Sequence, residues 1–290
     1  MSLLAYDFLR NALLGALAIG LVAPAVGIYL VQRRMSLIGD GIGHIAITGV
    51  AVGFLTGTSP VLTAVIVAAA GAIAIELLRA YGRLSGDIAL ALLFYGGIAG
   101  GVLLVGLAGD RSNANLLGYL FGSLLTTSEA DLVVIGVLAV GVFVVTVGGL
   151  PWLFAVSQDE EYAQVSGLPV RTLNLLLAVT AAVTVTVAMR AVGLLLVSAL
   201  MVVPVATAQQ VARGFAATMA SAMGIGVVVA GSGVYVSYQL DVAPGAAIVV
   251  LALGAFVAVA TTVALVRRLR RPSHPPEPVP VEPPDVVLES

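Results

Sequence analysis

The chain has 290 residues, of which 60% are hydrophobic and only 10% are charged, with a formal net charge of −2 and a mean hydropathy of +1.12. A soluble domain has about 25% charged residues, so this composition excludes a soluble protein and indicates an integral membrane protein. The scattered charges exclude a nucleic-acid-binding patch, and the absence of cysteine excludes disulfides, thiolate metal sites and cysteine nucleophiles.

Long apolar segments follow one another along the chain, each near the roughly 20 residues that a helix needs to cross the bilayer core. They predict nine spans, at about 8–31, 36–57, 60–80, 86–108, 129–150, 169–189, 191–212, 215–238 and 244–266. Alternating segments of the kind that form membrane β-barrels do not occur. The predicted fold is therefore an all-α integral membrane bundle of about nine transmembrane helices, with eight as the alternative count. The apolar segment 115–127 is too short to cross and is predicted to be a re-entrant or interfacial helix.

The two ends of the chain differ in character. The N-terminus lacks the small-residue cleavage site of a signal peptide, and we expect it to be an uncleaved first helix. Residues 1–271 are predicted to form one transmembrane domain. Residues 272–290 hold seven of the 13 prolines and are predicted to be a disordered, proline-rich tail. His274 lies in this tail and is interpreted as incidental.

Arginine placement predicts the orientation, because short cytoplasmic loops carry an excess of basic residues. If the C-terminus is cytoplasmic, nine spans put the N-terminus outside. Ten of the 13 basic residues then lie inside, namely Arg33, Arg34, Arg79, Arg83, Arg171, Arg213, Arg267, Arg268, Arg270 and Arg271. Only Arg10, Arg111 and Arg190 lie outside. Counting 115–127 as a further span would move four of the inner arginines outside.

The second span carries an aspartate and a histidine four residues apart, Asp40 and His44, which share one face of a helix. Helical rise from Arg34 puts His44 about 15 Å into a core about 30 Å thick. An aspartate deep in a helix costs roughly 2.5–3.5 kcal/mol, so the pair should face a cavity or a partner. A carboxylate and an imidazole suit Zn, Mn or Fe(II). A proton relay or a structural hydrogen bond remains equally open from the spacing.

The loop after the fifth span, 157–169, reads as a short helix. Ser157 is a candidate N-cap, and Gly167 with Pro169 would end the helix. Its first turn is acidic, where the helix dipole favours anions, through Asp159, Glu160 and Glu161. The orientation puts this loop in the cytoplasm, where it is either a solvated loop or a docking helix for a partner.

Other polar residues within the spans have simpler interpretations. Glu76 and Arg79 lie three residues apart and are predicted to pair. Met189 and Met201 are interpreted as apolar filler. The chain has no Walker A motif, no Ser-His-Asp arrangement and no HExxH motif, so no catalytic residues are assigned.

The residues from Arg33 to Val50 resemble the segment RRMxLxGDxLSHxxLxGV of the zinc/manganese/iron ABC-transporter permeases. Five further segments resemble this family in the same order, at 87–94, 119–125, 159–167, 192–208 and 237–246. The resemblance covers about residues 8–266, and the proline-rich tail lies outside it. Gly43 stands where the family usually has serine before the histidine.

The resemblance implies a fold like the type II ABC importers and a permease subunit that is not itself an enzyme. The implied partners are a cytoplasmic ATPase dimer that hydrolyses ATP, an extracytoplasmic metal-binding protein and a second permease copy. The implied location is the cell membrane of a prokaryote. The transported substrate would be a divalent metal (Mn, Zn or Fe), with no permanently bound cofactor.

The resemblance also assigns roles to residues. Asp40 and His44 match the family's metal-path motif, and transit demands weak, exchangeable ligation. The segment that docks on the ATPase corresponds to Asp159, Glu160, Glu161, Ala163 and Gly167. Two alternatives remain. One is a proton- or ion-coupled secondary transporter in which Asp40 and His44 form the relay. The other is a membrane enzyme or scaffold in which the two residues form a buried hydrogen bond.

Overall fold

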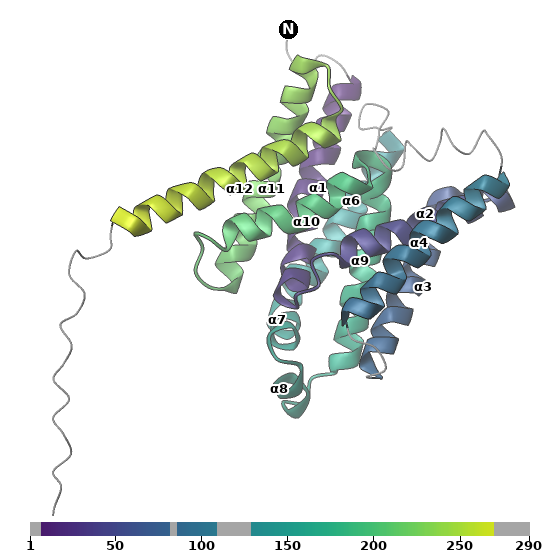
Figure 1. Ribbon diagram of the computed structural model, residues 1–290, viewed down its shortest axis with the longest axis horizontal. Coiled ribbons are helices and arrows are strands. Elements are labelled where there is room, and N and C mark those ends of the chain that lie inside the picture. The colour runs from purple at the N-terminus through teal and green to yellow at the C-terminus, as the bar shows by residue number, and fades with distance from the viewer. Residues whose placement is uncertain (1–6, 82–85, 109–128, 270–290) are drawn as a thin grey trace, which may run out of the picture.

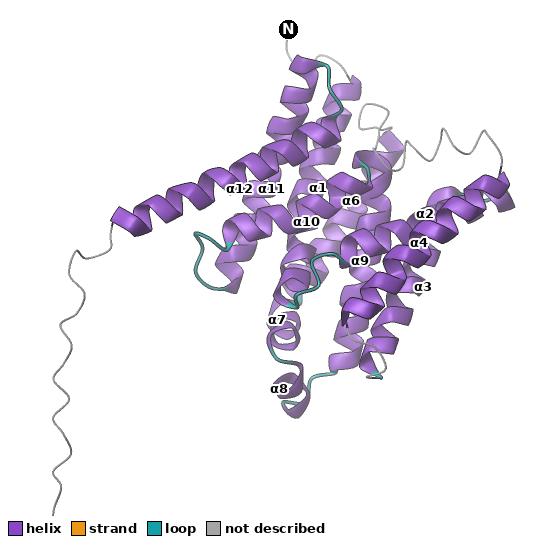
Figure 2. Ribbon diagram, viewed as in Figure 1, coloured by secondary structure: helices purple, strands orange, loops and turns teal. Residues whose placement is uncertain are grey.

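The computed structural model describes residues 7–81, 86–108 and 129–269, and this part of the chain is helical throughout, with short connections (Figures 1 and 2). The helices are α1 (Asp7–Gln32), α2 (Ile38–Thr56), α3 (Pro60–Ala80), α4 (Gly86–Ala108), α6 (Glu129–Phe143), the π-helix η3 (Val144–Gly148), α7 (Leu150–Gln158), α8 (Glu160–Val165), α9 (Val170–Val192), α10 (Leu194–Ala208), α11 (Phe215–Leu240) and α12 (Pro244–Leu269). The prediction of an all-α membrane bundle is confirmed.

Eight helices within the described residues are long and apolar enough to cross a membrane. The seventh predicted span, 191–212, corresponds to α10, which has 15 residues and is therefore about 22 Å long. Gly193, with a φ of 85°, separates α10 from α9 and shortens it at the start. The short helix predicted at 115–127 and the tail at 272–290 lie outside the described residues.

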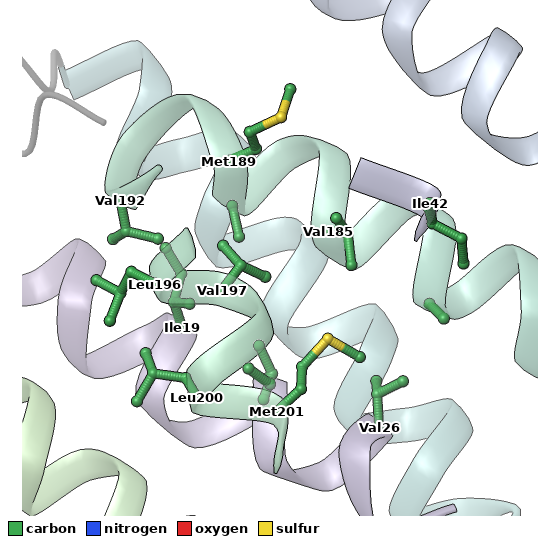
Figure 3. Close-up of a cluster of buried hydrophobic side chains, with 14 of the residues drawn as sticks. Ile19, Val26, Ile42, Val185, Met189, Val192, Leu196, Val197, Leu200 and Met201 are labelled. Atoms are coloured by element: carbon green, nitrogen blue, oxygen red, sulfur yellow. The ribbon is translucent and has the colours of Figure 1, made fainter. Parts of the chain in front are cut away.

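Helix α1 lies at the centre of the bundle and contacts α11, α10, α6 and α9. Figure 3 shows the core where α1 and α2 meet α9 and α10, with Ile19 and Ile42 among its buried side chains. Met189 and Met201 are also buried there, at 0% and 1% exposure. Their burial among aliphatic side chains agrees with their interpretation as apolar filler.

The fifth span is followed by a helix that the sequence did not indicate. Helix α6 continues into η3, and α7 then begins at Leu150 with Pro151 in its first turn. The Oη atom of Tyr29 in α1 donates a buried hydrogen bond to the carbonyl oxygen of Thr146, at 2.5 Å. A π-helix leaves backbone groups out of the regular α-helical pattern, and Tyr29 satisfies one of them.

The outer faces of α4, α6 and α12 carry large exposed aliphatic side chains. Examples are Val102, Val137 and Val257, which are all more than half exposed. Exposed apolar side chains on helices long enough to cross the bilayer suit contact with lipid tails. These three helices therefore present exposed apolar faces, whereas α1 and α2 are largely buried inside the bundle.

Candidate functional site

Helix α2 begins later than the sequence predicted. Residues 33–37 form a turn in which Arg34 adopts a left-handed conformation, with a φ of 59°. The first helical residue is Ile38, so His44 lies about 9 Å along a helix about 28 Å long. The depth predicted from Arg34 counted helical rise through residues that are not helical. The candidate site therefore lies about a third of the way along α2.

Asp40 and His44 point toward the same place, as their spacing predicts. The Nε2 atom of His44 lies 3.8 Å from Oδ2 of Asp40. The side chain of His44 is 18% exposed and that of Asp40 is 25% exposed, so both are partly accessible. The separation is longer than a hydrogen bond and leaves an ion room to contact both atoms.

Two side chains from other helices border this pair. The ring of Phe94 in α4 meets the His44 imidazole edge to face, with ring centroids 4.7 Å apart and an interplanar angle of 75°. The hydroxyl of Ser198 in α10 lies 3.5 Å from Oδ1 of Asp40, as a weak hydrogen-bond donor. The candidate site is thus assembled from α2, α4 and α10.

Glycines allow these helices to approach α2 closely. A Cβ added to Gly97 in α4 would lie 2.6 Å from the backbone nitrogen of Ile45 and 2.7 Å from the carbonyl carbon of His44. The carbonyl of Gly97 also accepts a hydrogen bond from Thr48, at 2.9 Å. The packing of α4 on α2 therefore holds the backbone of His44 directly.

The surroundings of Gly43 bear on its departure from the family pattern. A Cβ at this position would overlap the Cδ1 atom of Leu194, the first residue of α10. A serine in place of Gly43 would require Leu194 to move. In this chain, the space that a side chain at position 43 would need is occupied by Leu194.

The number of protein ligands in one copy of the chain is small. Among residues 7–81, 86–108 and 129–269, no group of three or more His, Cys, Asp or Glu side chains could hold a metal ion. Asp40 and His44 offer one carboxylate and one imidazole, which suit Mn, Zn and Fe(II). Such a pair can bind an ion transiently but needs further donors to complete its coordination.

The predicted docking segment contains α8, with a different cap from the one expected. Ser157 lies inside α7, and Asp159 is the N-cap, since its Oδ1 accepts a hydrogen bond from the N–H of Tyr162 at 2.9 Å. Asp159 can serve as the N-cap because its backbone is extended, with a φ of −153°, and so separates α7 from α8. Gly167 ends the segment with a φ of 82°, a conformation that favours glycine.

The side chains of this segment point in different directions. Ala163 is fully buried, whereas Glu161, Tyr162 and Val165 are exposed. Glu160 is 44% exposed but contacts the bundle. Its Oε1 atom accepts hydrogen bonds from Arg79 at 2.5 Å and from Asn174 at 3.2 Å.

A second cation joins this network. Arg33, in the turn before α2, lies 3.9 Å from Glu160 and donates to Asn174 at 2.6 Å and to Ser157 at 3.3 Å. Burial lowers the pKa of Arg33, and the nearby charge of Glu160 opposes that effect. A guanidinium stays protonated at neutral pH in any case. The network therefore buries permanent charge at the junction of α1, α2, α3, α8 and α9.

Arginines from distant parts of the sequence meet at this end of the bundle. Glu76 and Arg79 pair at 3.3 Å, which confirms that prediction, and Arg171 donates to the hydroxyl of Tyr81 at 3.0 Å. Gln32 donates to Gln158 at 2.5 Å. The loops before α2, after α3 and before α9 thus lie on one side, as the arginine pattern requires.

Several of these residues were not singled out by the sequence. Phe94 and Ser198 lie in segments that resemble the permease family, but nothing local linked them to Asp40 or His44. Asn174 and Gln158 carry no motif at all. Their partners lie 14 to 158 residues away in sequence, so only the fold brings them together.

Comparison with known proteins extends this description. The chain matches the ABC 3 transport family over residues 5–263. It is 33% identical over 245 residues to the manganese import system permease protein ScaB of Streptococcus parasanguinis, covering 84% of this chain and 86% of that protein. It is 30% identical over 258 residues to the high-affinity zinc uptake system membrane protein ZnuB of Haemophilus influenzae, covering 87% and 96%, respectively.

A solved structure shows the same fold. PsaBC from Streptococcus pneumoniae, in complex with Fab, superposes with a TM-score of 0.78 at 29% sequence identity. The match covers 88% of this chain and 91% of that one. The chain therefore belongs to the ABC 3 transport family and is a multi-span membrane permease of a bacterial ABC transporter.

Proposed function

We propose that this permease carries a divalent transition metal (Mn, Zn or Fe) into the cell, with Asp40 and His44 as transient ligands in its path. The observation that supports this most directly is the convergence of an aspartate and a histidine, 3.8 Å apart, within a membrane-spanning helix. Burying such polar groups in a membrane is costly unless they face a water-filled path or a binding partner. The names of the relatives ScaB and ZnuB support a metal as the substrate and import as the direction.

Weak ligation suits transport. An ion that is held by many ligands would leave slowly, whereas a pathway needs binding that is easily reversed. One carboxylate and one imidazole per chain meet this condition. Water molecules, or the same two residues of a second permease copy, would complete the coordination shell. The partial exposure of both side chains in one copy agrees with a homodimer that encloses the path between its protomers.

The energy source would be a pair of cytoplasmic ATPase subunits. Tyr162 and Val165 on α8 are 68% and 87% exposed, and Glu161 is exposed as well. Exposed apolar and acidic side chains on a short helix outside the spans suit contact with another protein. The nucleotide cycle would move this segment and alternate the access of the path. An extracytoplasmic binding protein would deliver the metal to the opposite face.

The contact of α8 with a cytoplasmic ATPase would also set the orientation of the permease in the membrane. The end of the bundle that carries Arg33, Arg79 and Arg171 would face the cytoplasm, with the N-terminus outside and the C-terminus inside. The acidic segment then faces the compartment that holds ATP. This arrangement requires no catalytic residue on the permease itself.

The test is transport by the purified permease reconstituted in proteoliposomes with its ATPase. We expect accumulation of Mn, Zn or Fe that requires ATP and stops when the ATPase is omitted. Each metal is presented separately and in competition, since the ligand pair does not discriminate among them. Uptake driven by a proton gradient without the ATPase would instead assign Asp40 and His44 to a proton relay and reject the proposal.

A further inference from the structure

The docking segment is tied to the rest of the bundle through one carboxylate oxygen. Oε1 of Glu160 accepts from Arg79 at 2.5 Å and from Asn174 at 3.2 Å, and it lies 3.9 Å from Nη1 of Arg33. These three residues come from the end of α3, the start of α9 and the turn before α2. One atom therefore links α8 to three other parts of the permease.

The charges in this network depend on one another. Arg33 is 6% exposed and Arg79 is 22% exposed, so both guanidinium groups are largely removed from water. Both approach Glu160, whose side chain is 44% exposed. Arg79 also pairs with the buried Glu76, whose charge acts on Arg33 as well. A guanidinium as buried as that of Arg33 is unfavourable without a negative charge nearby. The positions of the two arginines therefore depend in part on the Glu160 carboxylate.

The network also reaches the helix that carries the candidate metal ligands. Arg33 immediately precedes Arg34, whose left-handed backbone starts the turn into α2. The Nη1 atom of Arg79 lies 3.6 Å from the sulfur of Met35 in the same turn. Asp40 follows in the first turn of α2. A displacement of Glu160 would thus act on the start of α2, a few residues from Asp40.

We infer that Glu160 is a positioning residue, which transmits the position of the docking segment to α2 through Arg79 and Arg33. It does so from the inner side of α8, while the exposed Tyr162 and Val165 form the surface that contacts the ATPase. This inference rests on the proposed function, because it assumes that α8 responds to an ATPase. It separates two tasks within the segment, binding the partner and coupling the partner's motion to the metal path.

Two variants break the link from opposite sides, Glu160→Gln and Arg79→Gln. Each is assembled with the ATPase in proteoliposomes, and three quantities are measured: ATPase bound per permease, ATP hydrolysed and metal accumulated. We expect bound ATPase and hydrolysis to persist while metal transported per ATP falls about tenfold or more, within the usual range of coupling between sites. The losses should not multiply in the double variant, because each single variant already breaks the contact between Glu160 and Arg79.

The controls test the separation of tasks. Arg171→Gln removes a neighbouring arginine that bonds to Tyr81 and not to Glu160, and it should keep the wild-type ratio of metal to ATP. Val165→Ser on the exposed face should lower bound ATPase while that ratio is unchanged for the complexes that form. Thermal unfolding of every variant checks folding. If Glu160→Gln unfolds, Arg79→Gln decides the question, because it leaves α8 unaltered.

The inference is overturned if Glu160→Gln loses ATPase binding in proportion to uptake, or if both link variants keep the wild-type ratio of metal to ATP. Multiplicative losses in the double variant would also overturn it, because they would mean two independent effects. Failure of the proposed function looks different. In that case the wild-type complex itself accumulates no metal or binds no ATPase.

Discussion

The imidazole of His44 lies edge to face against the ring of Phe94, with 4.7 Å between ring centroids. An imidazole held in this way cannot rotate freely about the bond to its Cβ. The contact joins α2 to α4 beside the backbone approach at Gly97, so the orientation of His44 depends on both helices. A ligand pair with so few members gains from such restraint, because each donor must be in place when the ion arrives.

Replacing Phe94 with leucine should therefore weaken metal capture without unfolding the protein. An aromatic pair contributes about 0.5–1.5 kcal/mol beyond its buried area, so we expect the KM for metal uptake to rise about two- to tenfold. The rate at saturating metal should change less than the KM. The measurement is initial uptake against metal concentration. Phe143→Leu on α6, where the ring is 41% exposed, is the control, and an unchanged KM in Phe94→Leu would contradict the prediction.

Two adjacent glycines in α4 offer a matched pair for the packing of α4 on α2. Gly97→Ala places a methyl group 2.6 Å from the nitrogen of Ile45, against backbone that cannot move alone, whereas Gly96→Ala meets nothing within 4 Å. Overpacking of this kind costs about 1–3 kcal/mol. We expect Gly97→Ala to lower the apparent melting temperature in detergent and to reduce uptake, while Gly96→Ala does neither. Equal behaviour of the two variants would mean that α4 does not approach α2 at this point.

The space beside Gly43 can be tested by restoring the residue usual in the family. Gly43→Ser should destabilise this chain, because its Cβ would overlap Leu194. Leu194→Ala in the same protein should recover part of the loss by freeing that space. The readout is the apparent melting temperature of both single variants and the double variant, combined as a double-mutant cycle. A cycle without interaction energy would show that the two side chains do not compete for one volume.

Much of the fold could be predicted from hydropathy and arginine placement, because lipid contact demands long apolar helices. The boundaries of α3 and α4 agree with the expected spans at 60–80 and 86–108. The pairing of Asp40 with His44 also followed from the four-residue spacing, which a helix converts into proximity. The place of the pair along α2 did not follow, because the sequence did not show that the helix begins only at Ile38.

The residues around the Asp40–His44 pair could not be predicted from the sequence, for a different reason. Phe94 and Ser198 reach the pair only through the packing of α4 and α10 on α2, and side-chain periodicity does not specify which helices become neighbours. The contact of Glu160 with the bundle is a similar case. The sequence predicted three acidic residues in the first turn of a helix capped by Ser157. In the structure Asp159 is the cap, and Glu160 contacts two arginines. The role of each residue in the segment thus depends on tertiary contacts.

The central claim is that Asp40 and His44 lie on the metal path, and the most direct test is uptake by Asp40→Asn and His44→Gln in the reconstituted complex. Both substitutions keep a polar side chain of similar size, and thermal unfolding checks that each variant folds. Since even a change in residues that support metal ligands costs about 10–100-fold, each variant should lose at least that much uptake. Asp241→Asn, at an exposed left-handed helix end, is the control and should transport normally. Wild-type uptake by either Asp40→Asn or His44→Gln would contradict the account.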